Sequence, residues 1–246
     1  VGKTTTTINL SAALVELGKK VLIIDLDPQG NASTGLGIDY EQRNLTVYDV
    51  LLAEAAISSA ILPTSMAGLD IVPSTVDLSS ADIELIKTPN HSTALSRALV
   101  EDKTLADNYD FIFVDCPPSL SLLTINAMVV SDSVLIPLQS EFFALEGLSQ
   151  LMLSVREVRK SVNTGLRFEG VVLTMFDRRN NLSQQVEKDA RENLGELVFK
   201  TVIPRNVRVS EAPSHSVPVL TYEPRSRGAQ AYRRLAKEFL KNNKSI

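Results

Sequence analysis

The first residues, Val1-Gly2-Lys3-Thr4-Thr5, end as the phosphate-loop pattern G-x-x-x-x-G-K-[ST] ends. In that pattern Gly2 lets the backbone approach a phosphate, Lys3 brings a positive charge to the phosphate oxygens, and the Thr4 hydroxyl ligates Mg²⁺. The helix pattern that follows would point free N–H groups at the same anion. A bare G-K-T is common, and its alternative interpretation is an exposed helix start capped by a threonine.

Three aspartates supply the acidic groups that such a site needs. Asp25 and Asp27 follow the apolar run 21–24, and Asp115 ends a second apolar run at 111–114. Carboxylates two residues apart on an extended chain point the same way, and they repel unless a cation or hydrogen-bond donors satisfy them. We therefore predict that they serve a hydrated Mg²⁺ and an attacking water, with Asp115 in the role of a Walker-B aspartate. The alternative for any one of them alone is a solvated loop acid.

Buried strands and amphipathic helices must position these residues. Hydrophobic spacing predicts helices near 3–17, 78–87, 92–106, 144–162, 183–194 and 228–242, and strands near 21–24, 69–73, 110–115, 133–137, 168–175, 197–203 and 217–220. This alternation predicts an α/β fold with a doubly wound, mostly parallel sheet and helices on both faces. Ligands bind such sheets at the carboxyl ends of the strands, so both aspartate loops are expected at that edge.

Composition places limits on the class of protein. The 246 residues are 44% hydrophobic and 22% charged, and no linker or repeat divides them, which predicts one domain over residues 1–246. No apolar run approaches the roughly 18–20 residues of a membrane span, and the first residues do not read as a signal peptide. The single cysteine, Cys116, fits a reducing compartment. We expect a cytoplasmic protein.

Charge is divided unevenly along the chain. The net charge is −4, but residues 1–163 hold 10 Lys/Arg and 20 Asp/Glu whereas residues 164–246 hold 15 and 9. A basic C-terminal third of this kind can mark a face that binds nucleic acid or an anionic membrane. The alternative is an ordinary solvated surface that is uneven.

Several segments together match a known family, in the right order. They are Val1-Gly2-Lys3-Thr4-Thr5-Thr6, Asp25-Leu26-Asp27-Pro28-Gln29-Gly30-Asn31-Ala32, Asp115-Cys116-Pro117-Pro118-Ser119, Ala144-Leu145-Glu146-Gly147-Leu148, Val202-Ile203-Pro204-Arg205-Asn206-Val207-Arg208 and Tyr222-Glu223-Pro224-Arg225-Ser226-Arg227-Gly228. With this combination the chain resembles the ParA/Soj branch of the deviant Walker-A ATPases, over essentially its whole length.

The resemblance implies a slow ATPase of the P-loop class that uses ATP and Mg²⁺. It makes Lys3 the phosphate-binding lysine, Thr4 the Mg²⁺ ligand and Asp27 the residue that positions the hydrolytic water. Asp25 and Asp115 would belong to the outer Mg²⁺ shell and the switch regions. The residues expected to hold ATP are Gly2, Lys3, Thr4 and Thr5 at the phosphates, and Met175, Pro204 and Asn206 at the adenine.

The resemblance also implies partners. ATP would join two subunits into a homodimer, the dimer would bind DNA without sequence preference, and a ParB-type centromere-binding protein would stimulate hydrolysis and release. The matching basic positions are Arg178, Arg179, Arg205, Arg208 and Arg225. A nucleoid-associated protein without stable membrane association is expected.

The family pattern has a second lysine and a first, central strand in front of Val1. We therefore expect that the sequence begins inside its own phosphate loop and lacks the first strand of a single ATPase domain. Residues 1–246 alone would then fold poorly and form no ATP-driven dimer. A preceding helix-turn-helix domain and a chromosomal or plasmid origin stay open.

The sequence is also compatible with other ATPase classes to different degrees. A MinD-like ATPase that cycles on a membrane would use an amphipathic helix such as the apolar stripe within 229–240, although an ordinary docked helix has the same pattern. A nucleotide-switched scaffold or regulator would bind without needing turnover. An iron–sulfur reductase of the same fold needs two cysteines per chain, and the lone Cys116 excludes it.

Overall fold

The strand that carries Asp25 lies in the middle of a parallel sheet. In the computed structural model, which describes residues 2–88, 90–141 and 144–243, β1 (Val21–Asp25) pairs in parallel with β3 (Leu69–Val72) on one side and with β4 (Phe111–Asp115) on the other. The short β2 (Leu62–Pro63) adds an antiparallel edge to β3. β5 (Ser133–Gln139) and β6 (Arg167–Thr174) form a second parallel pair.

Helices connect these strands and cover them. They are α1 (Lys3–Glu16), α2 (Asn31–Gly35), α3 (Val47–Leu51), α4 (Leu78–Ile86), α5 (Ala94–Glu101), α6 (Thr104–Asn108), α7 (Leu122–Val130), α8 (Ala144–Ser161), α9 (Asn181–Leu194), α10 (Val207–Glu211), α11 (Val219–Tyr222) and α12 (Arg227–Asn243). Short 3₁₀ turns lie at Tyr40–Gln42, Ile57–Ala60, His91–Thr93, Gly195–Leu197 and Ala212–His215.

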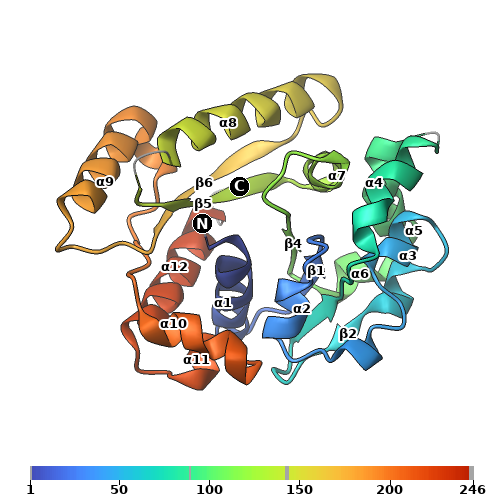
Figure 1. The fold of residues 1–246 in the computed structure, drawn as a ribbon, viewed down its shortest axis with the longest axis horizontal. Coiled ribbons are helices and arrows are strands. Elements are labelled where there is room, and N and C mark those ends of the chain that lie inside the picture. The colour runs from blue at the N-terminus through green and yellow to red at the C-terminus, as the bar shows by residue number, and fades with distance from the viewer. Residues whose placement is uncertain (1, 89, 142–143, 244–246) are drawn as a thin grey trace.

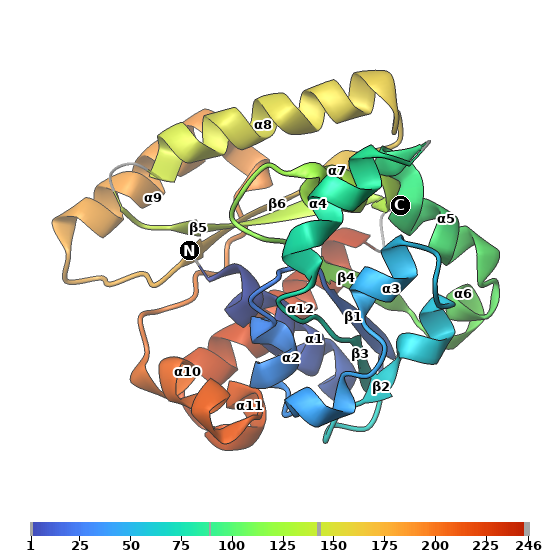
Figure 2. The same cartoon turned by 45° about the vertical axis from the view of Figure 1, so that its right-hand side comes forward.

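Alternate residues of β1 pack into two separate hydrophobic clusters, one on each face of the sheet. Val21 and Ile23 pack in the cluster formed with α1 and α12, whereas Leu22 and Ile24 pack in the cluster formed with α3, α4, α5 and α7. Figure 1 shows α1 and α12 side by side, and Figure 2 shows α3, α4 and α5 together on the other side of β1. Since side chains alternate across a strand, a strand apolar at every position must be covered on both faces. The predicted doubly wound α/β fold is confirmed.

The sheet is interrupted between β4 and β5. β4 is the last strand of one sheet and β5 the first of the other, and both line a cavity of about 890 Å³. Apolar side chains from both strands, from α7 and from α12 face this cavity, among them Val114, Leu135, Met128 and Phe239. The described strands therefore leave a gap in the middle of the expected continuous sheet.

Most of the predicted elements are confirmed within a few residues, but three predictions are wrong. Within the described residues, segment 197–203 forms one isolated bridge to β6, between Val198 and Val171, because the Glu238 carboxylate accepts the N–H groups of Lys200 and Thr201 and keeps them from pairing with the strand. Segment 217–220 is not a strand, since Val219 begins the short helix α11.

The third wrong prediction is a continuous helix over 92–106. The chain forms α5 and α6 instead, and the Asp102 carboxylate between them accepts hydrogen bonds from the backbone N–H and the hydroxyl of Thr104. A local bond from a side chain to the backbone competes with helix hydrogen bonds, so the Asp102–Thr104 pair favours a break between the two helices.

The last helix is docked against the body of the protein. Ala229, Tyr232, Ala236 and Phe239 are buried in the cluster that α12 shares with α1. The apolar stripe of this helix is therefore covered, and the docked-helix interpretation is confirmed. Within the described residues no helix is both long and apolar enough to cross a bilayer.

Candidate functional site

The start of α1 has the features expected of an anion-binding end. Gly2 adopts the left-handed conformation, with a φ of 86°, and no side chain of the described residues caps the helix. A Cβ built on Gly2 would lie 3.6 Å from Thr174 Oγ1 at the end of β6, so the backbone runs close to that strand. Lys3 lines the cavity together with Asp115. Thr5 is half-buried, and its carbonyl oxygen accepts a hydrogen bond from the Asn9 amide at 2.7 Å.

The two predicted acidic strand ends lie next to one another. Asp25 and Asp115 are register partners on β1 and β4, and the Leu26 N–H donates to the Asp115 carbonyl oxygen at 2.8 Å. Parallel strands end at the same edge, so this pairing puts both carboxylates beside the start of α1. The expected location at the carboxyl edge is confirmed.

The Asp115 carboxylate is buried, and only one of its two oxygens accepts a hydrogen bond in the described part of the chain. The Thr7 hydroxyl donates to its Oδ1 at 3.1 Å, while the buried Oδ2 has no partner within the described residues. Burial raises the pKa of this carboxyl to about 7, the neighbouring Thr4 and Thr7 hydroxyls lower it, and the nearby Asp25 raises it further. Asp115 is therefore an acceptor held in place and still open to a ligand.

Asp25 is fully buried and already engaged. Its Oδ2 accepts hydrogen bonds from the backbone N–H and the hydroxyl of Ser33 at 2.8 and 2.7 Å, and its Oδ1 accepts from the Asp27 N–H at 3.3 Å. Burial raises its pKa, and the bonds from Ser33 oppose that shift. This carboxylate ties α2 to the end of β1.

Asp27 is buried at the rim of the same edge, with 7% of its surface exposed. The Gln29 N–H donates to its Oδ1 at 3.0 Å, and its carbonyl oxygen accepts from the Gly30 N–H at 2.9 Å. Within the described residues, no three acidic, histidine or cysteine side chains converge as a preformed metal cage. Mg²⁺ usually keeps several waters and takes one or two protein ligands plus phosphate oxygens, so this arrangement fits it.

The three residues predicted at the adenine come from neighbouring loops. Phe176, next to Met175, forms an isolated bridge with Pro204, and its N–H donates to the Ile203 carbonyl oxygen at 3.0 Å. Met175 has a φ of 51° and is 42% exposed. The Asn206 side-chain oxygen is buried without a partner in the described part of the chain. The loops that carry Met175 and Pro204 thus meet just beyond the end of β6, whose Thr174 lies beside Gly2, whereas the Asn206 side chain lies beside Gly228 of α12.

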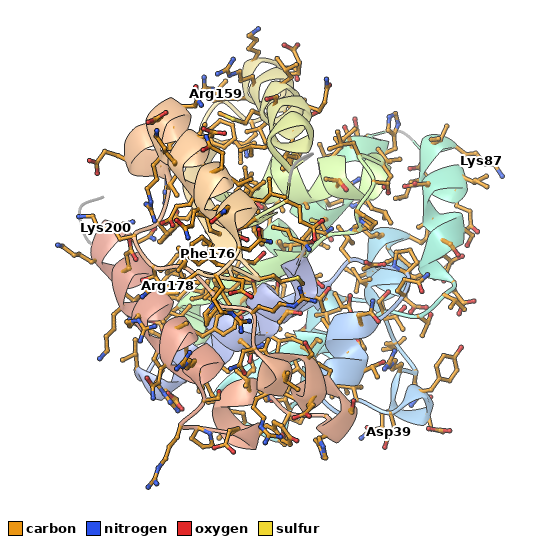
Figure 3. All side chains as sticks on the ribbon, turned by 60° about the vertical axis from the view of Figure 1, so that its left-hand side comes forward. Asp39, Lys87, Arg159, Phe176, Arg178 and Lys200 are labelled. Atoms are coloured by element: carbon orange, nitrogen blue, oxygen red, sulfur yellow. The ribbon has the colours of Figure 1, made fainter. Side chains whose placement is uncertain are left out.

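All five predicted basic residues are exposed, but their surroundings differ. Two of them form ion pairs, Arg179 with Asp177 at 2.9 Å and Arg208 with Glu211 at 2.8 Å. No ion pair is recorded for the other three within the described residues: Arg178, Arg205 and Arg225. The Arg205 N–H donates to the Phe176 carbonyl oxygen at 3.0 Å, which brings the loops that carry Arg178 and Arg205 together. Figure 3 shows Arg178 next to Phe176.

Sequence reasoning missed two residues of this site. Thr7 contacts Asp115, and the available signal was its position one helical turn after Thr4, on the same face of α1. Ser33 contacts Asp25 from eight residues away, and no periodicity indicates that contact. Its only signal was the Gly30-Asn31 turn, which is typical of a chain reversal.

Comparisons with known proteins agree with this geometry. A family model described as an AAA domain matches residues 1–168. The sporulation initiation inhibitor protein Soj of Bacillus subtilis (strain 168) is 52% identical over 242 residues, covering 98% of this chain and 94% of that protein. The chromosome partitioning protein ParA of Caulobacter vibrioides (strain NA1000 / CB15N) is 54% identical over 240 residues, covering 98% and 90%.

A solved structure extends the comparison. Cobyrinic acid a,c-diamide synthase from Mycobacterium smegmatis, with bound ATP analogue and magnesium, is 34% identical with a TM-score of 0.85, covering 99% of this chain and 91% of that one. The fold, the acidic strand ends beside the start of α1 and two relatives matched over nearly their whole length point the same way: the chain belongs to the Soj/ParA family of chromosome-partitioning ATPases.

Proposed function

We propose that this chain is an ATP-dependent DNA-segregation ATPase that binds ATP and Mg²⁺ at the carboxyl edge of its sheet. The observation that carries the proposal is the buried Oδ2 of Asp115, which lacks a partner within the described residues. A buried acceptor without a donor costs about 1–3 kcal/mol. A hydrated Mg²⁺ on the phosphates of ATP would satisfy this oxygen at the place where Lys3 and Thr4 begin α1.

Each residue of the edge has a separate task in this proposal. Lys3 holds the β- and γ-phosphate oxygens, and the Thr4 hydroxyl ligates Mg²⁺, which neutralises charge on the phosphates. Asp27 orients the attacking water, since Asp25 is already bonded to α2 and cannot turn toward it. Asp115 and Asp25 act on the outer shell of the metal.

The nucleotide would extend along the end of β6. Gly2 and Thr5 border the phosphates, and Met175, Pro204 and Asn206 form the place for the adenine. The unpartnered oxygen of Asn206 supports this assignment, because it is an acceptor that the adenine amino group could use.

The same edge is the proposed switch. ATP would order the segments after Asp27 and Asp115, and the ordered surfaces would pair two subunits into a homodimer. The support is positional, since both segments leave neighbouring strands beside α1. Hydrolysis, stimulated by a ParB-type partner, would return the monomers and release DNA from a cytoplasmic, nucleoid-associated complex.

DNA would be held by the basic C-terminal third. Arg178, Arg205 and Arg225 are the leading residues of this surface, because none of them forms an ion pair within the described part of the chain, as Arg179 and Arg208 do. Arg179 and Arg208 would contribute by exchanging their carboxylate partners for DNA phosphates. Phosphate contacts of this kind give binding without sequence preference and with strong salt dependence.

We also infer that residues 1–246 form one ATPase domain whose cleft between β4 and β5 receives the strand in front of the phosphate loop. This is supported by the apolar lining of the cleft and by the edges of β4 and β5 that line it, which pair with no other strand among the described residues. Such edges are satisfied when a strand pairs with both of them. The full-length protein should unfold cooperatively, whereas residues 1–246 alone should not.

The function is tested by DNA-stimulated ATP hydrolysis and DNA retention in the full-length protein. Asp27→Ala should abolish hydrolysis while nucleotide binding remains. Arg205→Ala plus Arg225→Ala should weaken DNA retention and reduce the slope of log K against log salt by about two. Arg156→Ala plus Arg159→Ala on α8 removes the same charge elsewhere and should change neither the DNA retention nor its salt dependence. An equal loss of DNA retention in both double variants would refute the assigned DNA surface.

A further inference from the structure

The Arg43 guanidinium forms hydrogen bonds that hold together the segment following Asp27. Its Nε and Nη2 donate to the Ile38 carbonyl oxygen at 3.1 and 2.7 Å, and Nη2 also donates to the Thr34 hydroxyl at 2.9 Å. Its Nη1 donates to the Ser74 carbonyl oxygen, in the loop after β3, at 3.0 Å. One planar fork therefore joins the end of α2 to a neighbouring strand loop, which a single ammonium could not do.

The backbone N–H group of Ser74 is also hydrogen-bonded to α2. The Ser74 N–H donates to the Ser33 hydroxyl oxygen at 3.1 Å, and that hydroxyl donates in turn to Asp25 Oδ2 at 2.7 Å. Ser33, Ser74 and Asp25 are all fully buried. A continuous hydrogen-bonded chain thus runs from Arg43 through the loop after β3 to the end of β1, and its links between Ser74, Ser33 and Asp25 are shielded from water.

The turn that carries Asp27 lies against this chain. Gly30, which closes the turn on the Asp27 carbonyl oxygen, has a φ of 61°. A Cβ built on Gly30 would lie 2.7 Å from Arg43 Nη1 and 2.9 Å from the Ser74 carbonyl oxygen. The guanidinium and the turn are in direct contact, so the position of one limits the position of the other.

We infer that Arg43 is a positioning residue for ATP hydrolysis, acting through the Gly30 turn and the Ser33 bond to hold Asp27 in place. The inference rests on the proposed role of Asp27. Arg43 itself does not touch the acidic strand ends, so its removal should leave nucleotide binding intact. What it changes is the geometry of the turn, and small displacements near reacting groups lower the rate more than the affinity.

The test compares steady-state ATP hydrolysis of the full-length protein with its Arg43→Ala and Arg43→Lys variants. Both should lower kcat by about 10- to 100-fold and leave KM for MgATP within about twofold. Arg233→Ala is the matched control, because that arginine also forks, onto the Glu16 carboxylate, at the far end of α1. It should lower the unfolding temperature and keep kcat.

Each result decides between positioning and another role. A normal kcat in Arg43→Ala overturns the inference. So does full recovery in Arg43→Lys, which would assign the effect to charge, and so does a fall in kcat matched by the fraction of sites that no longer bind nucleotide. Asp27→Ala is measured in parallel: normal hydrolysis there refutes the proposed function itself, independently of Arg43.

A double substitution adds a test of the connection. Ser33→Ala removes the hydroxyl between Ser74 and Asp25. If Arg43 acts through this chain, Ser33→Ala combined with Arg43→Ala should lower kcat by less than the product of the two single effects. Independent, multiplicative losses would overturn the inferred path.

Discussion

Asp115→Asn should make the nucleotide-free protein more stable while it removes hydrolysis. The carboxylate is 1% exposed and lies beside Asp25, and its Oδ2 has no partner within the described residues. The neutral amide keeps an oxygen for the Thr7 hydroxyl but carries no charge into the interior. A site built to receive a cation is strained without it, and the substitution relieves that strain.

The magnitude follows from the pKa. Burial raises the pKa of Asp115 from 3.8 to about 7, and about three pKa units correspond to about 4 kcal/mol as an upper limit. The new amide N–H₂ group has no acceptor among the described residues of the interior, and this lowers the gain in stability by about 1–3 kcal/mol. We therefore expect a net gain of about 1–3 kcal/mol in the free energy of unfolding at pH 8.

The sign of the pH dependence identifies the cause. Below pH 3.8 the carboxyl is protonated in both states, and above about pH 7 it is ionised in both, so the folded state then carries the whole penalty. The wild type should therefore gain stability as pH falls from 7 toward 4, and the advantage of Asp115→Asn should shrink by about 1.4 kcal/mol per pH unit in that window.

Urea unfolding in EDTA without nucleotide, at pH 8, 6 and 5, measures this. Asp107→Asn removes an exposed aspartate on α6 and serves as the control for loss of charge. A variant that is destabilised at pH 8, or an advantage that stays constant down to pH 5, would show that the burial of Asp115 is not the source of the effect.

Two further substitutions test the C-terminal half. Asp177→Asn frees Arg179 from its exposed ion pair with Asp177, whose pKa the Arg179 guanidinium lowers to about 2, and it should raise DNA affinity at low salt by about three- to tenfold, measured beside the equal charge change Asp189→Asn. Gly170→Ala would put a Cβ 2.6 Å from Phe199 at a φ of 149°, and it should destabilise by about 2–4 kcal/mol in urea unfolding. The control is Gly147→Ala on α8, where the new Cβ would meet no atom of the described residues within 4 Å.

The contradicting results are equally definite. If Asp189→Asn raises DNA affinity as much as Asp177→Asn does, net charge is responsible and Arg179 is not held back by its partner. If Gly147→Ala costs as much stability as Gly170→Ala, the crowding at Phe199 does not limit the second position.

The local sequence pattern predicted those helices and strands whose own apolar residues show which faces are buried. The run 21–24 is apolar at every position, so it could only be a strand covered on both faces, and the aspartates that follow it had to lie at the carboxyl edge. The apolar stripe of α12 likewise predicted a docked helix. Local pattern failed at 197–203, where the Glu238 carboxylate, distant in sequence, competes for backbone N–H groups.

By itself, the sequence determined the α/β class, the family and the residue types of the phosphate site, because these depend on periodicity and on short motifs. Only the tertiary structure decided what each carboxylate is free to do. Asp25 and Asp115 are alike in sequence context, but Ser33 occupies one of them while the other keeps a buried oxygen open. The difference arises from contacts between segments far apart in the chain, and no local pattern records such contacts.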